Sequence, residues 1–133
     1  MKLSEKLAND VIKRLKFRNG LVLAVVCDSK TKEILMIGYQ NREAVKRSFT
    51  EGRMYFWSRE RRKLWLKGET SGHFQYIERI RIDCDGDAIL YYVKQVGGAC
   101  HEGYKSCFYR ELTREGIKVV EKKIFDPEKV YRS

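Results

Sequence analysis

The chain has 133 residues, of which 43% are hydrophobic and 35% charged, and its formal net charge is +10. The composition excludes a disordered chain, and the length suits one hydrophobic core, so we expect a single domain over residues 1–133. No apolar run approaches the ~20 residues needed to cross a membrane, and the first residues do not resemble a signal peptide. We therefore expect a cytoplasmic protein that does not bind membranes.

The positive charge and the four cysteines narrow the classes of function. A small basic protein can bind nucleic acid, an anionic membrane or a phosphorylated small molecule, and charge alone does not distinguish them. Disulfides are rare in a reducing compartment, so clustered cysteines there indicate metal binding or catalysis. Cys27 stands apart at the end of an apolar run, and we expect it to be buried in the core.

The first half of the chain predicts a helix, a β-hairpin and a second helix. Leucine and valine recur at helical spacing after Ser4, a possible N-cap, and Asn41 is placed to cap the second helix. Two apolar, β-branched runs flank a polar turn, which is typical of a hairpin. The expected helices span residues 3–17 and 41–49, and the expected strands span residues 21–27 and 33–39.

The second half predicts strands separated by polar turns. Alternating or β-branched apolar runs indicate strands at residues 54–58, 63–67, 74–83, 88–96 and 117–125. No repeat or interdomain linker is visible. The elements predict an α+β fold with a largely antiparallel, partly closed sheet that short helices cover.

Cys84, Cys100 and Cys107 form the first candidate site. Their spacing matches no paired zinc-finger knuckle, and a fourth protein ligand is not obvious. Three thiolates with an open position would suit a catalytic zinc, which lowers the pKa of its bound water to about 7. His101 could then accept or relay a proton. A structural zinc site and plain buried thiols are the alternatives.

Three carboxylates form the second candidate site, on Asp83, Asp85 and Asp87. If this segment is extended, the carboxylates start on one face and Cys84 on the other. Gly86 permits a tight backbone, and oxygen ligands suit magnesium, which usually acts beside substrate phosphates. The alternative is an ordinary acidic turn between two strands.

The loop at residues 67–73 is the third candidate site. Its small residues expose backbone N–H groups, the hydroxyls of Thr70 and Ser71 add donors, and Lys67 adds charge. This pattern suits a phosphate, although it is not a P-loop. The alternative is a solvated turn.

A basic turn and two tryptophans lie near that loop in the sequence. Arg59 could contact a second phosphate, while Trp57 or Trp65 could stack on a base. For Arg61 and Arg62 we favour a solvated turn, and core packing is the alternative for both tryptophans.

In combination these motifs resemble the phosphoribosyl-AMP cyclohydrolase family. The resemblance covers about residues 20–110 and implies hydrolytic opening of the adenine ring of phosphoribosyl-AMP between N1 and C6, a step of histidine biosynthesis. It rests on Trp57-Ser58-Arg59, Leu64-Trp65, Lys67-Gly68-Glu69-Thr70-Ser71-Gly72-His73, Asp83-Cys84-Asp85-Gly86-Asp87, Ala99-Cys100-His101 and Ser106-Cys107-Phe108.

The resemblance also implies two metals and a homodimer whose zinc site draws ligands from both subunits. Zinc falls on Cys84, Cys100 and Cys107, and magnesium on Asp83, Asp85 and Asp87. In the mechanism that we hypothesise, zinc-activated water attacks C6 and His101 takes or relays the proton. The expected substrate-binding residues are Trp57, Arg59, Trp65, Lys67, Glu69, Thr70, Ser71 and His73.

This sequence differs from the family pattern at two positions, and one other class of function is an alternative. Glu102 and Leu66 differ from the residues frequent in the family, which affects substrate contacts alone. We expect no fused pyrophosphohydrolase domain, and hence only the cyclohydrolase activity. The rival is a zinc-stabilised nucleic-acid-binding module, which would show salt-sensitive affinity without turnover but leaves the three aspartates unexplained. A third possibility is another zinc hydrolase that acts on a nucleotide base, but this sequence lacks the H-x-E and P-C-x-x-C signature of the zinc deaminases.

Overall fold

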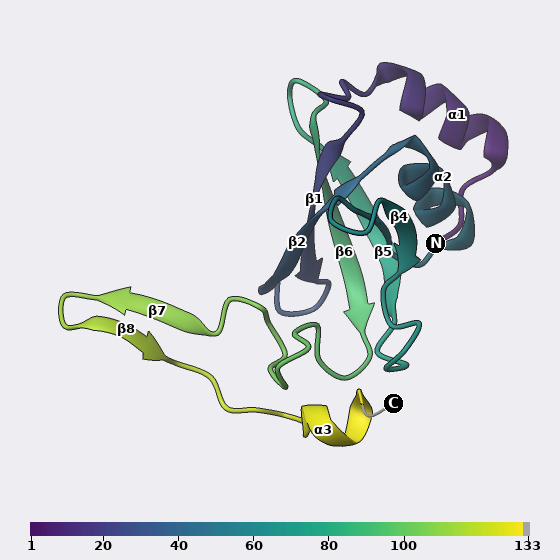
Figure 1. Ribbon diagram of the computed structural model, residues 1–133. Coiled ribbons are helices and arrows are strands. Elements are labelled where there is room, and N and C mark those ends of the chain that lie inside the picture. The colour runs from purple at the N-terminus through teal and green to yellow at the C-terminus, as the bar shows by residue number, and fades with distance from the viewer. Residues whose placement is uncertain (132–133) are drawn as a thin grey trace.

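The computed structural model describes residues 1–131 and has the predicted α+β, largely antiparallel architecture (Figure 1). Three short helices accompany eight strands in this part of the chain. In chain order they are α1 (Glu5–Arg14), β1 (Val22–Asp28), β2 (Ile34–Gln40), α2 (Arg42–Glu51), β3 (Tyr55–Ser58), β4 (Lys63–Leu66), β5 (Gln75–Ile82), β6 (Ala88–Gln95), β7 (Arg110–Thr113), β8 (Gly116–Val119) and α3 (Pro127–Val130).

The first two helices begin at the predicted caps. The Ser4 side chain accepts a hydrogen bond from the Leu7 amide at 3.1 Å, and the Asn41 side chain accepts one from the Ala44 amide at 2.9 Å. Such bonds satisfy amides that the first turn of a helix leaves without partners. α1 is shorter than predicted, because the backbone is already extended at Leu15, with ψ 148°.

Four strands form the central sheet in the order β2-β1-β6-β5. The β1–β2 and β5–β6 pairs are antiparallel hairpins, whereas β1 and β6 are parallel neighbours. The sheet is open, with β2 and β5 at its edges, rather than partly closed. β3–β4 and β7–β8 form separate two-stranded sheets.

α1 and α2 cover one face of the central sheet (Figure 1). Alternation along β1 turns Val22, Ala24 and Val26 toward the helices, and each of them is at most 1% exposed. Burying such aliphatic and aromatic side chains contributes roughly 1.5–3 kcal/mol apiece, which makes this layer the main source of stability. Cys27 is also buried, as predicted, at 3% exposed.

We call the opposite side of the sheet the outer face. β1 and its neighbours present Leu23, Val25, Ile37 and Leu90 there, since Val25 pairs with Ile37 on β2 and with Leu90 on β6. Ile37 is half exposed and the other three are partly buried. The outer face is therefore apolar over β1, β2 and β6, although no helix covers it, and Arg79 and Arg81 of β5 border this apolar area.

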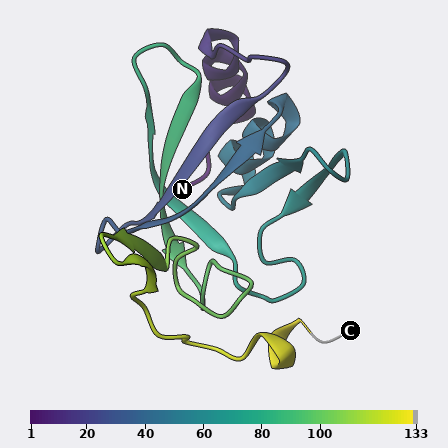
Figure 2. The same cartoon turned by 60° about the vertical axis from the view of Figure 1, so that its left-hand side comes forward.

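The end of the chain differs from the prediction. The strand expected at residues 117–125 ends at Val119 as β8, and it pairs with β7 in a hairpin that the sequence pattern did not predict. Residues beyond it run irregularly to α3 (Figure 2). Within residues 1–131 no helix has the length and apolar character needed to cross a membrane.

Candidate active site

The loop that follows β6 carries Cys100, His101 and Cys107, and the β1–β2 hairpin holds it in place. The Cys107 amide donates to the Leu35 carbonyl at 2.7 Å, and the Ser106 hydroxyl donates to the Ile34 carbonyl at 2.7 Å. These two hydrogen bonds hold the loop against the start of β2. This contact gives two of the three candidate thiols a defined position.

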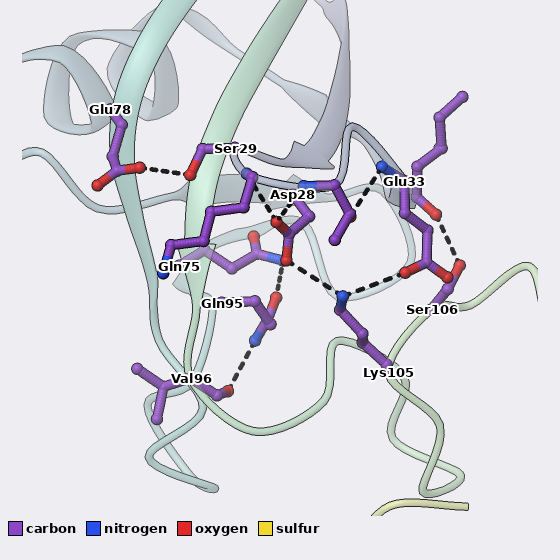
Figure 3. Close-up of polar contacts among 12 residues, drawn as sticks. Asp28, Ser29, Glu33, Gln75, Glu78, Gln95, Val96, Lys105 and Ser106 are labelled. Carbon is purple, nitrogen blue, oxygen red and sulfur yellow. Dashed lines mark hydrogen bonds and ion pairs between the residues drawn. The ribbon is translucent and has the colours of Figure 1, made fainter. Parts of the chain in front are cut away.

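Lys105 adds a charged clamp to the same contact (Figure 3). Its ammonium lies 3.2 Å from a carboxylate oxygen of Asp28 and 3.2 Å from one of Glu33, at opposite sides of the β1–β2 turn. Burial raises the pKa of Asp28, but hydrogen bonds from the Thr31 and Lys30 amides and from Lys105 outweigh it and lower that pKa. The ion pair between Lys105 and the charged Asp28 thus ties the cysteine loop to the β1–β2 turn.

The sulfurs of Cys100 and Cys107 lie together at the base of this loop. Cys100 is 4% exposed, and burial together with the neighbouring Cys100 charge raises the pKa of Cys107 to about 11. The Lys67 ammonium donates to the Ala99 carbonyl at 2.6 Å, and burial lowers the pKa of Lys67 while the two cysteine charges oppose that shift. Two adjoining thiols beside a buried cation suit a thiophilic metal such as zinc, which deprotonates its sulfur ligands.

A pocket of about 500 Å³ opens beside the cysteine loop. It lies between β4, the loop at residues 67–73 and His101. Of the substrate-binding candidates, the pocket walls include Trp65, Lys67, Glu69, Thr70 and Ser71. These candidates and the predicted proton carrier therefore share one cavity.

The other three substrate-binding candidates do not line that pocket. Trp57 pairs with Leu64 across the β3–β4 ladder. The Arg59 guanidinium stacks 4.1 Å from the centre of the Tyr39 ring, and the His73 ring meets Phe125 edge-on at 4.7 Å. Each of them packs against protein within the described part of the chain.

Several pocket residues were not predicted to bind substrate, namely Ser58, Glu60, Arg61, Lys63, Leu66, Gly68 and Tyr131. The sequence favours a solvated turn for Arg61, which lines the pocket in the structure. Lys63 could have been found from the strand period, because Lys63, Trp65 and Lys67 alternate onto one face of β4 and its extension. No local signal places Tyr131 there, since it lies 65 residues beyond Leu66, the end of β4.

The loop at residues 67–73 leaves part of its backbone free for a ligand. The amides of Glu69, Gly72 and Phe74 donate to carbonyls of the same loop region, and the His73 amide donates to the Ser71 hydroxyl. Within residues 1–131 the amides of Thr70 and Ser71 have no acceptor, and both residues line the pocket. Free amides beside a cavity suit an anionic oxygen.

The carboxylates of Asp83, Asp85 and Asp87 converge at the turn between β5 and β6, within 4.8 Å of one another. The predicted strand-like alternation is wrong here, because the segment turns at Gly86, whose φ is 74°. The hydrogen bonds to Asp87 and then to Asp83 raise the pKa of Asp85, and the bonds to Asp85, Asp83 and Arg18 lower that of Asp87. Three carboxylates crowded at the surface suit a hard cation.

The three predicted zinc ligands are divided between opposite ends of the sheet (Figure 1). Cys84 belongs to the β5–β6 turn and is exposed, while Cys100 and Cys107 follow the far end of β6. β6 has eight residues, so its ends are separated by about 25 Å at ~3.3 Å per residue. Zinc–sulfur bonds are about 2.3 Å long. One chain therefore does not bring the three thiols together.

The sequence matches the family model described as phosphoribosyl-AMP cyclohydrolase over residues 36–109, more than half of the chain. The chain belongs to the phosphoribosyl-AMP cyclohydrolase family. The match begins in β2, includes both sets of predicted metal ligands, and ends just after Cys107.

Two relatives named phosphoribosyl-AMP cyclohydrolase are similar over nearly their whole length, and a third, longer relative is similar over part of its length. The phosphoribosyl-AMP cyclohydrolase of Methanosarcina acetivorans is 57% identical over 117 residues, which are 88% of this chain and 95% of the relative. That of Methanothermobacter thermautotrophicus is 50% identical over 95% of this chain and 96% of the relative. The histidine biosynthesis bifunctional protein HisIE of Thermoanaerobacter pseudethanolicus is 48% identical, and the matched region is 58% of its length. Family membership supports the enzyme prediction over a nucleic-acid-binding module.

Proposed function

We propose that this protein hydrolyses phosphoribosyl-AMP in histidine biosynthesis, opening the adenine ring between N1 and C6. The observation that carries the proposal is the meeting of the Cys100–Cys107 pair, Lys67 and His101 beside a pocket of about 500 Å³. A cavity of that size suits a nucleotide-sized ligand. Membership of the cyclohydrolase family supplies the substrate class.

Cys100 and Cys107, together with Cys84 of the partner subunit, would hold a zinc ion. Bound zinc supplies a water whose pKa is lowered to about 7, the nucleophile for C6. The open fourth position that such chemistry needs is available if the protein contributes three thiols. The adjoining sulfurs of Cys100 and Cys107 support this assignment.

The protein's own side chains bind the substrate and move its protons. His101 lies at the pocket wall next to Cys100, where it can take the proton from the attacking water and pass it to the ring nitrogen that leaves. The free amides of Thr70 and Ser71 would bind one phosphate of the substrate, and Lys63 with Arg61 would add charge. Trp65 offers its ring to the purine.

The separation of Cys84 from Cys100 and Cys107 supports a homodimer. In a two-fold dimer whose sheets run in opposite directions, each end of one chain would meet the opposite end of the other, so every site would combine both sets of thiols. The aspartates of the β5–β6 turn would then approach the partner's pocket. A magnesium ion held by Asp83, Asp85 and Asp87 would there orient a substrate phosphate.

Metal analysis and an ultraviolet assay for ring opening test the proposal. Purified wild-type protein is expected to contain about one zinc per chain, to open phosphoribosyl-AMP, and to lose activity in a chelator. Cys100→Ser should lower both bound zinc and activity, whereas Cys27→Ser, a buried thiol away from the site, should retain zinc. A fully active, zinc-replete Cys100→Ser variant would refute the assignment. His101→Ala is expected to keep zinc and lose turnover.

A further inference from the structure

The β7–β8 hairpin has one apolar and one polar side. Leu112 pairs with Ile117 and Arg110 with Val119 on one side of the ladder, while Glu111 pairs with Lys118 on the other. Leu112, Ile117 and Val119 are 79%, 66% and 58% exposed. We call these three residues the apolar side of the hairpin. Alternation of this kind is typical of a strand pair that packs against a surface on one side.

Within residues 1–131, no surface of the same chain receives the apolar side. Within residues 1–131, β7 and β8 pack mainly against each other, and the hairpin projects from the lower end of the sheet, away from α1 and α2 (Figures 1 and 2). A two-stranded hairpin without support is marginally stable in water. The hairpin therefore needs a contact outside its own subunit.

The hairpin begins at the candidate zinc site. β7 starts three residues after Cys107, and Phe108 between them is 54% exposed. If a second copy of this chain placed its Cys84 beside Cys100 and Cys107, that copy would lie next to the first residues of β7. At that end of such a chain, Ile82 is 44% exposed two residues before Cys84, on the helix-covered side of the sheet, since it pairs with the buried Ile89. The apolar outer face begins at the same end with Leu23, which pairs with Ala88 at the start of β6.

We propose that the β7–β8 hairpin is an arm that clasps a second copy of this chain, with its apolar side on the end of the partner that carries Cys84. The arm's direction rests on the proposed function, because the shared thiol site sets how the two chains meet. In a two-fold dimer each chain's hairpin would pack on the Cys84 end of the other chain, so that one hairpin lies at each end of the dimer. The outer faces of the two sheets would lie between the arms, which accounts for an apolar surface that no helix covers.

Two double variants separate an arm from a freely exposed hairpin. Leu112→Asn with Ile117→Asn alters the apolar side, and Glu111→Asn with Lys118→Asn introduces the same residues on the polar side of the same strands. None of the four side chains belongs to the core, so both variants should fold, which far-ultraviolet circular dichroism would verify. Sedimentation equilibrium then gives the dissociation constant of the dimer for each protein.

We expect the apolar-side variant to raise the dissociation constant about tenfold or more relative to wild type, and the polar-side variant to change it little. Equal dissociation constants for both variants and wild type would overturn the arm, as would a monomeric wild type. Because the measurement uses no substrate, its outcome is independent of the ring-opening assay. An inactive wild-type protein that still dimerises through the apolar side would refute the proposed function and retain the arm.

Discussion

Lys105 shows how one side chain supports the candidate site from a distance. It lies outside the pocket, and its ammonium joins Asp28 to Glu33 beneath the loop of Cys100 and Cys107. The Asp28 side chain is 16% exposed, so the pair is more shielded from water than a surface ion pair. Removal of the lysine would leave two neighbouring carboxylates without their cation.

Lys105→Met is expected to lower the free energy of unfolding by about 1–2 kcal/mol at pH 7. The pKa of Asp28 is lowered in the folded protein, so its ion pair stabilises above the unfolded pKa of about 3.9 and is lost as pH falls through the folded pKa. The difference between variant and wild type should therefore shrink in acid. Urea unfolding at pH 7 and near pH 3 measures it.

Lys118→Met serves as the control for that experiment. Lys118 forms an ion pair with Glu115 in which both side chains are largely exposed, so this variant should cost little at either pH. An undiminished effect of Lys105→Met in acid would mean that the lysine acts through packing of its methylene chain instead.

A buried polar network joins four elements of the fold, namely β2, α2, β3 and β6. The Tyr91 hydroxyl of β6 donates to the Gln40 side chain of β2 at 2.9 Å, and the Gln40 amide donates to Ser48 of α2 and to the Tyr55 carbonyl. Gln40, Ser48 and Tyr91 are each fully buried. Such a network is stabilising only while every member has a partner.

Tyr91→Phe should cost about 1–3 kcal/mol of unfolding free energy, because the Gln40 carbonyl oxygen would be buried without its donor. Thermal or urea unfolding measures the change. Tyr92→Phe is the matched control: it is the next residue of β6, on the outer face, and its hydroxyl has no hydrogen-bond partner within residues 1–131. Equal losses for the two variants would contradict the role of the network.

The elements also show what sequence patterns could and could not predict. Caps at Ser4 and Asn41 and the alternation along β5 and β6 act locally, and the predictions from them are confirmed. The parallel pairing of β1 with β6 joins segments some 65 residues apart, and no local pattern encodes it. The β7–β8 hairpin was not predicted, because β7 is short and mostly polar and does not show a strand pattern. The turn residue Gly116 was overlooked because it directly precedes the apolar run that begins at Ile117.

At the scale of the whole molecule, motifs select candidate site residues but do not predict where these residues lie. Spacing and residue type suffice to select Cys84, Cys100 and Cys107 as possible ligands. Their separation along β6 depends on strand direction, which is a property of the folded sheet. The pocket likewise gains Lys63 and Tyr131 through tertiary contact.

The opposite placement of Cys84 and the Cys100–Cys107 pair has a genetic consequence. If each site takes one thiol from one subunit and two from the other, then Cys84→Ser and Cys107→Ser chains are both inactive alone, yet their mixed dimer has one intact site and one doubly defective site. Co-expression of the two genes should therefore restore about one quarter of wild-type activity, since half of the dimers are mixed. Cys100→Ser with Cys107→Ser is the control pair and should restore none. Two alleles that each fail alone could thus sustain growth together.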